Sequence, residues 1–313
     1  MKKIIISIAA CGTLALGATA CGDDDSNANA SGGGGDLSGT IKIDGSSTVA
    51  PFAQAAQEGF QAENPNVKIT VGTSGTGGGF EKFCAGETDI SDASRPIKDD
   101  EEVPVCKKAG IAYKEIQVAN DGISVVTSKE LTVECLTTDQ LKELWNQGSK
   151  VKKLSELDPK LPDTTLSLFG PGTDSGTFDF FTDEINGEEG VSREDYQPSE
   201  DDNVLVQGVA GESGGLGYFG HSYYEQNQDK LNLVKVDGGD GCVEPTVDTI
   251  QSGEYKPLSR PLFMYPSTKA LKRPEVKAFL DYVVENYQAI ADASQIVAMS
   301  PEQADKSKSD LGS

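Results

Sequence analysis

Three loops rich in glycine, serine and threonine each stand directly before an amphipathic segment of the chain. They span residues 44–51 (DGSSTVAP), 72–80 (GTSGTGGGF) and 169–178 (FGPGTDSGTF). Backbone N–H groups in the first turn of a helix lack intrahelical partners, and serine and threonine hydroxyls add donors without adding charge. A loop of this kind at a helix start can hold an anion, and three that converge could surround one oxyanion.

Each loop by itself is also typical of an ordinary helix cap or turn, so the interpretation depends on their recurrence. One cation stands close to such a loop, Arg95 in the segment DASRPI. Its planar guanidinium suits two oxygens of an oxyanion. The loops and Arg95 together predict a binding site for a tetrahedral oxyanion.

The segments that must position these loops alternate between strand and helix patterns. Strand patterns occur in residues 39–47, in a segment ending near Val71, and in residues 166–169. Apolar residues then recur at helical spacing behind each loop, which predicts an α/β fold with helices packed on a sheet. The expected buried helical positions are Val49, Phe52, Ala56 and Phe60, then Phe80 to Cys84, then Phe178, Phe181 and Ile185.

Residues 1–21 carry two lysines, an apolar stretch too short to span a bilayer comfortably, and small residues before Cys21. This pattern predicts a secretion signal. Its end, LGATAC, is similar to a bacterial lipobox, in which the cysteine is lipidated after cleavage. Residues 22–37 are polar and rich in glycine and serine, as in a flexible tether. We therefore expect a domain held at the outer face of the cell membrane by lipid on Cys21; a freely secreted protein with a disordered N-terminus is the alternative.

The chain has 50 acidic and 27 basic residues, a formal net charge of −23. Nucleic-acid-binding proteins present basic faces, so this charge argues against nucleic acid as a partner. It does not argue against an anion site. Exposed charges are screened over about 8 Å at physiological ionic strength, whereas donors in a closed cleft act at contact.

Four cysteines remain when Cys11 and Cys21 are set aside with the N-terminal segment. In an exported protein an even number of cysteines favours disulfides over metal or redox chemistry, and the chain has no CxxC motif. Two disulfides are therefore expected, with three possible pairings. The four residues are Cys84, Cys106, Cys135 and Cys242.

Other chemistries fit the sequence poorly. Residues 211–215 (GESGG) match a nucleophile elbow around Ser213, but the only histidine, His221, follows too closely for the usual triad order, and we expect it at the surface or at a hinge. No glycine-rich loop ends in Gly-Lys-Ser or Gly-Lys-Thr, as a P-loop does. Residues 237–241 (DGGDG) are typical of a turn rather than of a calcium site. We expect no enzymatic activity, no cofactor and no metal.

Four motifs, taken in order, resemble one family. DGSSTVAPF, GTSGTGGGFEKFCAGETDISDASRPI, FGPGTDSGTFDFF and SGGLGYFG are similar to segments of the phosphate-binding lipoproteins of bacterial phosphate ABC importers, the PstS family, over about residues 38–300. The resemblance implies a two-lobed α/β fold of the type II periplasmic-binding-protein class that closes on inorganic phosphate in a cleft between the lobes. It also implies delivery of phosphate to the membrane permease and ATPase subunits of an ABC importer, and we expect a monomer.

By position, the resemblance places phosphate on the three loops and on the segment DISDASR. Two positions depart from the family pattern: Ser94 stands where many members have an aspartate that accepts the proton of hydrogen phosphate, and Pro171 where many have an arginine. Arg95 is expected to replace that arginine, and Asp174 is the candidate acceptor. The implied phosphate-binding residues are Ser46, Ser47, Thr48, Thr76, Ser94, Arg95, Asp174, Ser175, Gly176 and Thr177.

The resemblance also implies where the chain crosses between lobes. The first lobe would comprise residues 38–122 and 257–313, and the second residues 123–256, with crossings in residues 116–128 (IQVANDGISVVTS) and 257–267 (PLSRPLFMYPS).

With these boundaries we favour the disulfides Cys84–Cys106 and Cys135–Cys242, because each then stays inside one lobe. Two functional alternatives remain open. One is a binding protein for another tetrahedral oxyanion such as sulfate, and the other is a surface lipoprotein that has lost transport.

Overall fold

The computed structural model describes residues 37–173 and 175–312 of the chain. The predicted signal segment, its Cys21, residues 22–36 of the predicted tether, and Asp174 lie outside these described residues. Within the described part, no helix combines the length and the apolar character needed to cross a membrane.

The first lobe is built on three parallel strands. β1 (Gly39–Gly45) lies between β2 (Val67–Gly72) and β3 (Ile90–Ala93). β11 (Ser259–Pro266) pairs antiparallel with β3, and the first half of β4 (Ile116–Ser128) pairs antiparallel with β11. Because β1, β2 and β3 are parallel, their carboxyl ends meet at one edge of the sheet, and the first two glycine- and hydroxyl-rich loops start there.

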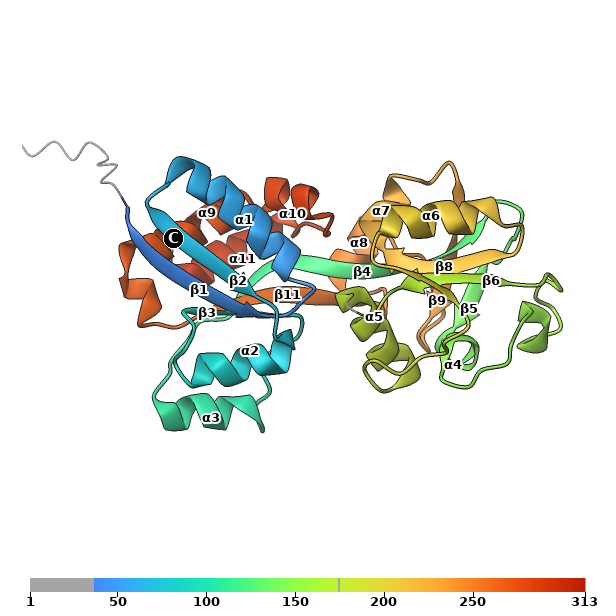
Figure 1. Cartoon of the computed structure of the whole chain (residues 1–313), viewed down its shortest axis with the longest axis horizontal. Coiled ribbons are helices and arrows are strands. Elements are labelled where there is room, and N and C mark those ends of the chain that lie inside the picture. The colour runs from blue at the N-terminus through green and yellow to red at the C-terminus, as the bar shows by residue number, and fades with distance from the viewer. Residues whose placement is uncertain (1–36, 174, 313) are drawn as a thin grey trace, which may run out of the picture. The chain divides into compact units, whose positions relative to one another are not determined.

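Helices cover both faces of this sheet (Figure 1). The predicted apolar face of the first helix is buried, with Phe52 fully enclosed and Phe60 nearly so. α2 and α3 pack on the opposite face around Phe80 and Phe83. The helices of this lobe are α1 (Ala50–Glu63), α2 (Gly75–Cys84), α3 (Glu102–Ala109), α9 (Pro274–Glu285), α10 (Tyr287–Ser294) and α11 (Pro301–Leu311), with a 3-10 turn at Ala270–Lys272.

The second lobe repeats the alternation of strands and helices. β6 (Ser167–Pro171) pairs in parallel with β7 (Gln197–Ser199) and β8 (Gly215–Gly220). The second half of β4 pairs with β8 and with β9 (Leu231–Asp237), and β9 also carries the short strands β5 (Cys135–Thr137) and β10 (Cys242–Val243). The helices of this lobe are α4 (Thr138–Trp145), α5 (Gly176–Phe181), α6 (Asp202–Gly211), α7 (His221–Glu225) and α8 (Val247–Ser252), with a 3-10 turn at Leu154–Glu156 and a π-helix, Thr182–Asn186, directly after α5.

β4 and β11 belong to both halves of the fold, and Figure 1 shows them side by side as they pass from one half to the other. One apolar core gathers residues up to Ala119 and from Leu262 onward, and the second core gathers residues from Ile123 to Leu258 together with Val297. The two cores on either side of a pair of shared strands define a two-lobed α/β fold, so the predicted fold class is confirmed.

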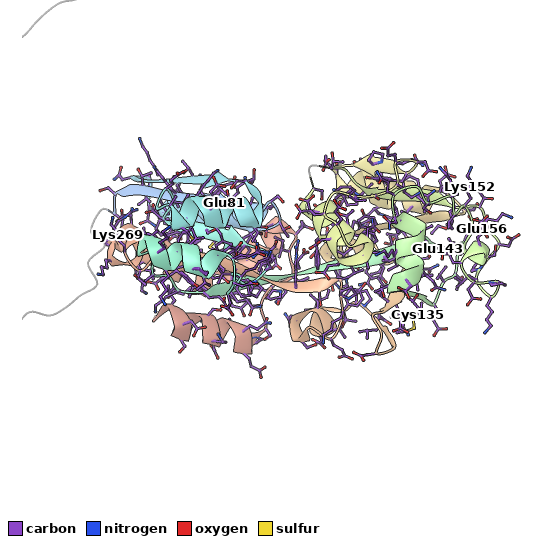
Figure 2. The ribbon with its side chains drawn as sticks, turned by 90° about the horizontal axis from the view of Figure 1, so that it is seen from below. Glu81, Cys135, Glu143, Lys152, Glu156 and Lys269 are labelled. Carbon is purple, nitrogen blue, oxygen red and sulfur yellow. A yellow bond between two sulfur atoms is a disulfide. The ribbon has the colours of Figure 1, made fainter. Side chains whose placement is uncertain are left out.

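Charged side chains cover the outer surfaces of both lobes. Glu81 and Lys269 on the first lobe and Glu143, Lys152 and Glu156 on the second are all exposed, and Figure 2 shows them on the outside of the ribbon. These charged side chains are therefore solvated.

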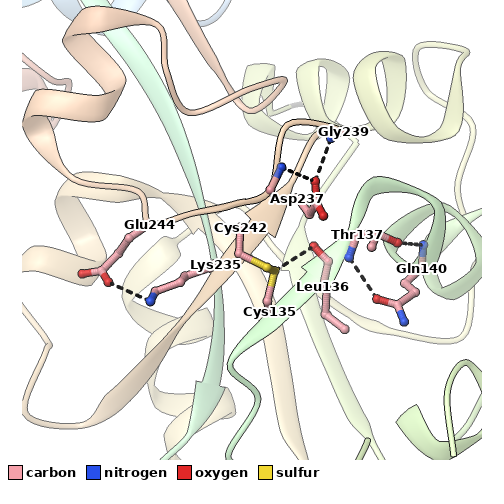
Figure 3. Close-up of a disulfide and its surroundings, with 10 residues drawn as sticks. Cys135, Leu136, Thr137, Gln140, Lys235, Asp237, Gly239, Cys242 and Glu244 are labelled. Carbon is pink, nitrogen blue, oxygen red and sulfur yellow. Dashed lines mark hydrogen bonds and ion pairs between the residues drawn. A yellow bond between two sulfur atoms is a disulfide. The ribbon is translucent and has the colours of Figure 1, made fainter. Parts of the chain in front are cut away.

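Both disulfides have the favoured pairing. Cys84 joins Cys106 between α2 and α3, and Cys135 joins Cys242 between β5 and β10. Figure 3 shows the second bridge beside the end of β9, close to the capping box of α4 and to the Lys235–Glu244 ion pair. The predicted connectivity is therefore confirmed.

Candidate functional site

A cleft of about 730 Å³ brings all three predicted loops together. Its walls include Ser46, Ser47 and Thr48 from the first loop, residues 74–78 from the second, and Gly176 from the third. The first two follow the carboxyl ends of β1 and β2 and the third follows β6, which is where α/β sheets generally bind ligands.

The first loop presents hydroxyls that are not used as helix caps. α1 begins after Val49, and no side chain among the described residues caps its first turn. The backbone of Ser46 is fixed instead, because its N–H donates to the carbonyl of Asp92 at 3.0 Å. Ser47 and Thr48 follow this anchored residue and line the cleft, with their hydroxyls close to Gly176.

The second loop and the end of β3 form a pair of hydroxyls. The Oγ1 atom of Thr76 and the Oγ atom of Ser94 are 3.0 Å apart, and the N–H of Ser94 donates to Thr76 Oγ1 at 3.2 Å. Ser74 is engaged elsewhere, since its N–H and hydroxyl both donate to Asp44 Oδ1, at 3.0 and 2.6 Å. Thr76 and Ser94, both expected at the site, thus lie together at the cleft wall.

The third loop contributes to the cleft mainly through Gly176. Ser175 acts as an ordinary cap, because its Oγ accepts the N–H of Thr177 at 3.2 Å, and both residues flank Gly176 without lining the cleft. A Cβ atom at Gly176 would meet Thr48 Oγ1, with Thr48 N at 2.8 Å and Ser47 Oγ at 2.9 Å. Only glycine allows this close approach of the two lobes.

Arg95 lies at the cleft wall, but its guanidinium is already engaged. Nη2 and Nη1 donate to the two carboxylate oxygens of Glu102 at 2.7 and 3.0 Å, a bidentate ion pair. Glu102 is the largest cause of the raised pKa of Arg95. The sequence did not reveal this partner, which lies seven residues along in α3.

The sequence suggested that Arg95 is the one cation near the loops. This expectation was wrong, because Lys98 and Arg260 line the same cleft. Arg260 is the better placed of the two. Its Nη2 donates to Thr48 Oγ1 at 2.9 Å and lies 3.4 Å from the carbonyl oxygen of Gly176, so it joins loops from both lobes. Its guanidinium also lies 3.7 Å from the centre of the Phe180 ring.

Arg260 is held by the strand that crosses between the lobes. It stands directly opposite Asp121 in the pairing of β11 with β4, and its Nε donates to Asp121 Oδ2 at 3.2 Å. Burial lowers the pKa of Arg260, and Asp121 opposes that change. The sequence placed Arg260 inside one predicted crossing and Asp121 inside the other, but it gave no reason to pair them. The register of the two strands brings them together.

Carboxylates from the second lobe line the opposite wall, which the sequence analysis also missed. Asp179, Asp183, Glu184 and Glu189 all face the cleft from α5 and the π-helix region. Burial raises the pKa of Asp179 to about 6, with Glu189 adding to the change and Arg260 opposing it. Burial also raises the pKa of Glu184.

The hydrolase alternative finds no support in the surroundings of His221. Contrary to the expected surface or hinge position, this side chain is buried, and its Nδ1 lies 2.9 Å from the hydroxyl of Ser124 rather than near Ser213. Ser124 is itself fully buried. Among the residues described by the structure, no group of three or more histidine, cysteine or acidic residues is arranged to hold a metal.

Comparisons with known proteins agree with the class of fold and site. A family model described as a PBP superfamily domain matches residues 30–286. The phosphate-binding protein PstS of Staphylococcus haemolyticus is 43% identical over 302 residues, covering 94% of this chain and 93% of that protein. Protein SphX of Synechococcus elongatus is 45% identical over 249 residues, covering 79% of this chain and 73% of that protein.

Solved structures of phosphate-binding proteins are also similar to this chain. A possible phosphate-binding protein from Planctomyces limnophilus has 47% identity and a TM-score of 0.83, over 88% of this chain and 98% of that chain. A putative phosphate ABC transporter substrate-binding protein with bound phosphate, from Clostridium perfringens, has 28% identity and a TM-score of 0.58, over 84% of this chain and all of that chain.

The fold, the cleft and these relatives together define a two-lobed solute-binding protein. The chain belongs to the PBP superfamily and, within it, to the family of phosphate-binding PstS proteins.

Proposed function

We propose that this protein captures inorganic phosphate outside the cytoplasm and delivers it to an ABC importer. The observation that carries the proposal is the convergence of Thr48, Gly176 and Arg260, from two lobes and a shared strand, at one hydroxyl-lined cleft. The relatives named as phosphate-binding proteins support the same ligand.

The proposed ligand set is formed by hydroxyls, backbone N–H groups and arginine. Charge-assisted hydrogen bonds contribute about 1.5–3 kcal/mol each, so a few of them suffice for micromolar binding after desolvation and ordering costs. Arg260 joins the set expected from the sequence, and Arg95 reaches phosphate by exchanging its carboxylate partner Glu102 for the ligand. The first-lobe contacts are Ser46, Ser47, Thr48, Thr76 and Ser94, and Gly176 is the second-lobe contact in the cleft wall. Ser175 and Thr177, which flank Gly176 outside that wall, and Asp174 complete the set expected from the sequence.

Binding closes the two lobes on phosphate. We assign residues 38–122 and 257–313 to the first lobe and 123–256 to the second, and the division of the two apolar cores supports this assignment. Phosphate stabilises the closed state because only that state uses donors from both lobes.

The proposed cellular setting follows from the N-terminal segment. Cleavage before Cys21 and lipidation of its thiol would anchor the domain to the outer face of the cell membrane, with residues 22–37 as a tether. The protein would work as a monomer with the permease and ATPase subunits of an importer. Labelling with a radioactive fatty acid in a bacterial host, lost on Cys21→Ser, tests the anchor.

Calorimetric titration with phosphate and, separately, with sulfate tests the ligand. We expect micromolar or tighter binding of phosphate and no measurable heat with sulfate. Equal binding of both anions would indicate a general oxyanion carrier. Binding of neither would indicate a surface lipoprotein that has kept the fold without transport.

A further inference from the structure

The loop between α10 and α11, residues 295–300, connects the two lobes in addition to the shared strands. It joins two helices of the first lobe, yet it also contacts the second lobe. Val297 packs in the core of the second lobe, whereas its neighbour Ala298 packs in the core of the first. The boundary between the lobes therefore runs through this segment, which we call the α10–α11 loop.

Hydrogen bonds hold this region of the first lobe to helices of the second lobe. The Nε2 atom of Gln251, in α8, donates to the carbonyl of Ala298 at 2.9 Å. The Nε2 atom of Gln226, which directly follows α7, donates to the Oε1 atom of Gln295. Gln303, in α11, donates through its Nε2 to the carbonyl of Gln251 at 2.9 Å. All three bonds join one lobe to the other, and they lie outside the lining of the phosphate cleft.

The α10–α11 loop lies on the opposite face of β4 from the cleft. Neighbouring side chains of a strand point to opposite faces, and Asp121 of β4 pairs with Arg260, which lines the cleft. The preceding residue, Asn120, contacts the loop instead, since its Nδ2 donates to the carbonyl of Ala298 at 3.1 Å. On this face, a groove of about 500 Å³ lies between residues of α7 and α8 and residues of α10 and the loop.

Rotation of the lobes couples this groove to the cleft. β4 and β11 are shared by the lobes, so a rotation about them that widens the cleft narrows the opposite face. In this structure the lobes already touch beside the cleft, where Gly176 meets Thr48, and the bonds of the α10–α11 loop are formed at the same time. These bonds are therefore compatible with contact between the lobes at the cleft.

Gln295 has a backbone conformation that favours glycine. Its φ is 57°, in the left-handed region, and it is the one non-glycine residue with a positive φ in the described part of the chain. Glycine is the usual residue at such a position after a helix, and a side chain there costs stability. The side chain of Gln295 accepts the bond from Gln226, so this cost accompanies a contact between the lobes.

We propose that the α10–α11 loop, through Gln226 and Gln251, holds the lobes closed from the face opposite the cleft and so sets how tightly and how long phosphate is bound. Opening of the cleft moves α7 and α8 into the groove, and the bonds cannot keep their geometry during that movement. Because phosphate leaves only when the cleft opens, losing bonds that favour closure weakens the affinity and speeds release. The proposal rests on the proposed function for its phosphate measurements, whereas closure can also be measured without ligand.

Removal of the glutamine side chains should weaken phosphate binding although the cleft itself is unchanged. Gln226→Ala and Gln251→Ala each remove one neutral hydrogen bond between the lobes and should each raise the Kd about three- to fivefold, with about a tenfold effect in the double variant. Calorimetric titration measures the Kd. A chase of bound radioactive phosphate with unlabelled phosphate measures the dissociation rate, which should rise by a similar factor. In Gln251→Ala the carbonyl of Ala298 keeps its bond from Asn120, so it is not left without a partner.

Two further variants separate closure from folding. Gln295→Gly removes an interlobe bond and relieves the left-handed backbone, so it should not lower the melting temperature, while the phosphate Kd rises about three- to fivefold. Gln288→Ala is the matched control, because Gln288 lines the same groove but donates to Asp292 of its own helix. Its phosphate Kd should stay within about twofold of the wild type.

Small-angle X-ray scattering of the ligand-free protein measures closure directly. The double variant Gln226→Ala with Gln251→Ala should have a larger radius of gyration than the wild type, because open lobes extend further apart. Saturating phosphate should bring both proteins to the same value.

Each outcome supports or contradicts the proposal. An unchanged Kd and dissociation rate in the double variant, or tighter binding, contradict a role of the loop in closure. An equal loss of affinity in Gln288→Ala contradicts the assignment to the interlobe bonds. If the wild type binds no phosphate, the proposed function fails, and scattering without ligand decides the proposal alone. A larger radius in the double variant then supports it, and equal radii contradict it.

Discussion

Arg260 provides the strongest single perturbation of the proposed site. Its guanidinium donates to Thr48, lies beside the carbonyl of Gly176 and pairs with Asp121, so it stands where the two lobes meet. Loss of one or two charge-assisted hydrogen bonds to phosphate costs about 3 kcal/mol, which is roughly 150-fold in Kd. We therefore expect Arg260→Met to bind phosphate about two orders of magnitude more weakly than the wild type.

Binding must be separated from folding in this experiment, because Asp121 is largely buried and loses its partner in Arg260→Met. Breaking a buried ion pair can cost several kcal/mol of stability. The double variant Asp121→Asn with Arg260→Met removes the unpaired carboxylate, so it should recover thermal stability while phosphate binding stays weak. Arg260→Lys keeps the charge and loses the planar fork, and its Kd should fall between those of the wild type and Arg260→Met.

Arg273 is the matched control. It makes comparable ion pairs with Asp89 and Glu275 but does not line the cleft, so Arg273→Met should leave the phosphate Kd within about twofold. Isothermal titration calorimetry measures the Kd values, and calorimetric melting measures stability. A folded Arg260→Met protein that binds phosphate as tightly as the wild type would refute this role of Arg260.

Three further predictions concern closure and stability. Gly176→Ala should weaken phosphate binding at least about tenfold, measured by titration, because its Cβ would meet the backbone and hydroxyl of Thr48; unchanged affinity would contradict contact between the lobes at this point. Burial lowers the pKa of His221 to about 4, below its ordinary 6.5, so the unfolded state binds the proton first and stability should fall by about 2–3 kcal/mol as pH drops from about 6.5 to 4. His221→Gln should lose that part of the pH dependence in melting experiments, and an identical dependence would show that other groups cause it. Replacing Cys135 and Cys242 by serine should cost about 4–5 kcal/mol of unfolding free energy, because the bridge joins residues 107 positions apart; a difference below about 1 kcal/mol in denaturant titration would contradict this loop-closure argument.

Local patterns explain why much of the fold could be predicted. The segment that the family resemblance implied as a crossing between lobes, residues 116–128, is β4 itself. The buried positions Phe52 and Phe60 followed from helical spacing, and both lie in the core of the first lobe. The disulfide pairing followed from assigning each bridge to one lobe.

The charged parts of the site could not be predicted in this way, because they depend on contacts between distant segments. Arg260 and Asp121 are 139 residues apart and meet only through the register of two strands. The engagement of Arg95 depends on where α3 places Glu102. Asp183 and Glu184 lie in the π-helix that continues α5, and the sequence carried no signal for that continuation.

A crystal structure of the protein with bound phosphate tests the central claim most directly. We predict one phosphate in the cleft between the lobes, in contact with the hydroxyls of Ser47 and Thr48, the backbone at Gly176 and the guanidinium of Arg260. Phosphate bound away from these four residues, or a cleft that stays empty in crystals grown at saturating phosphate, would contradict the account.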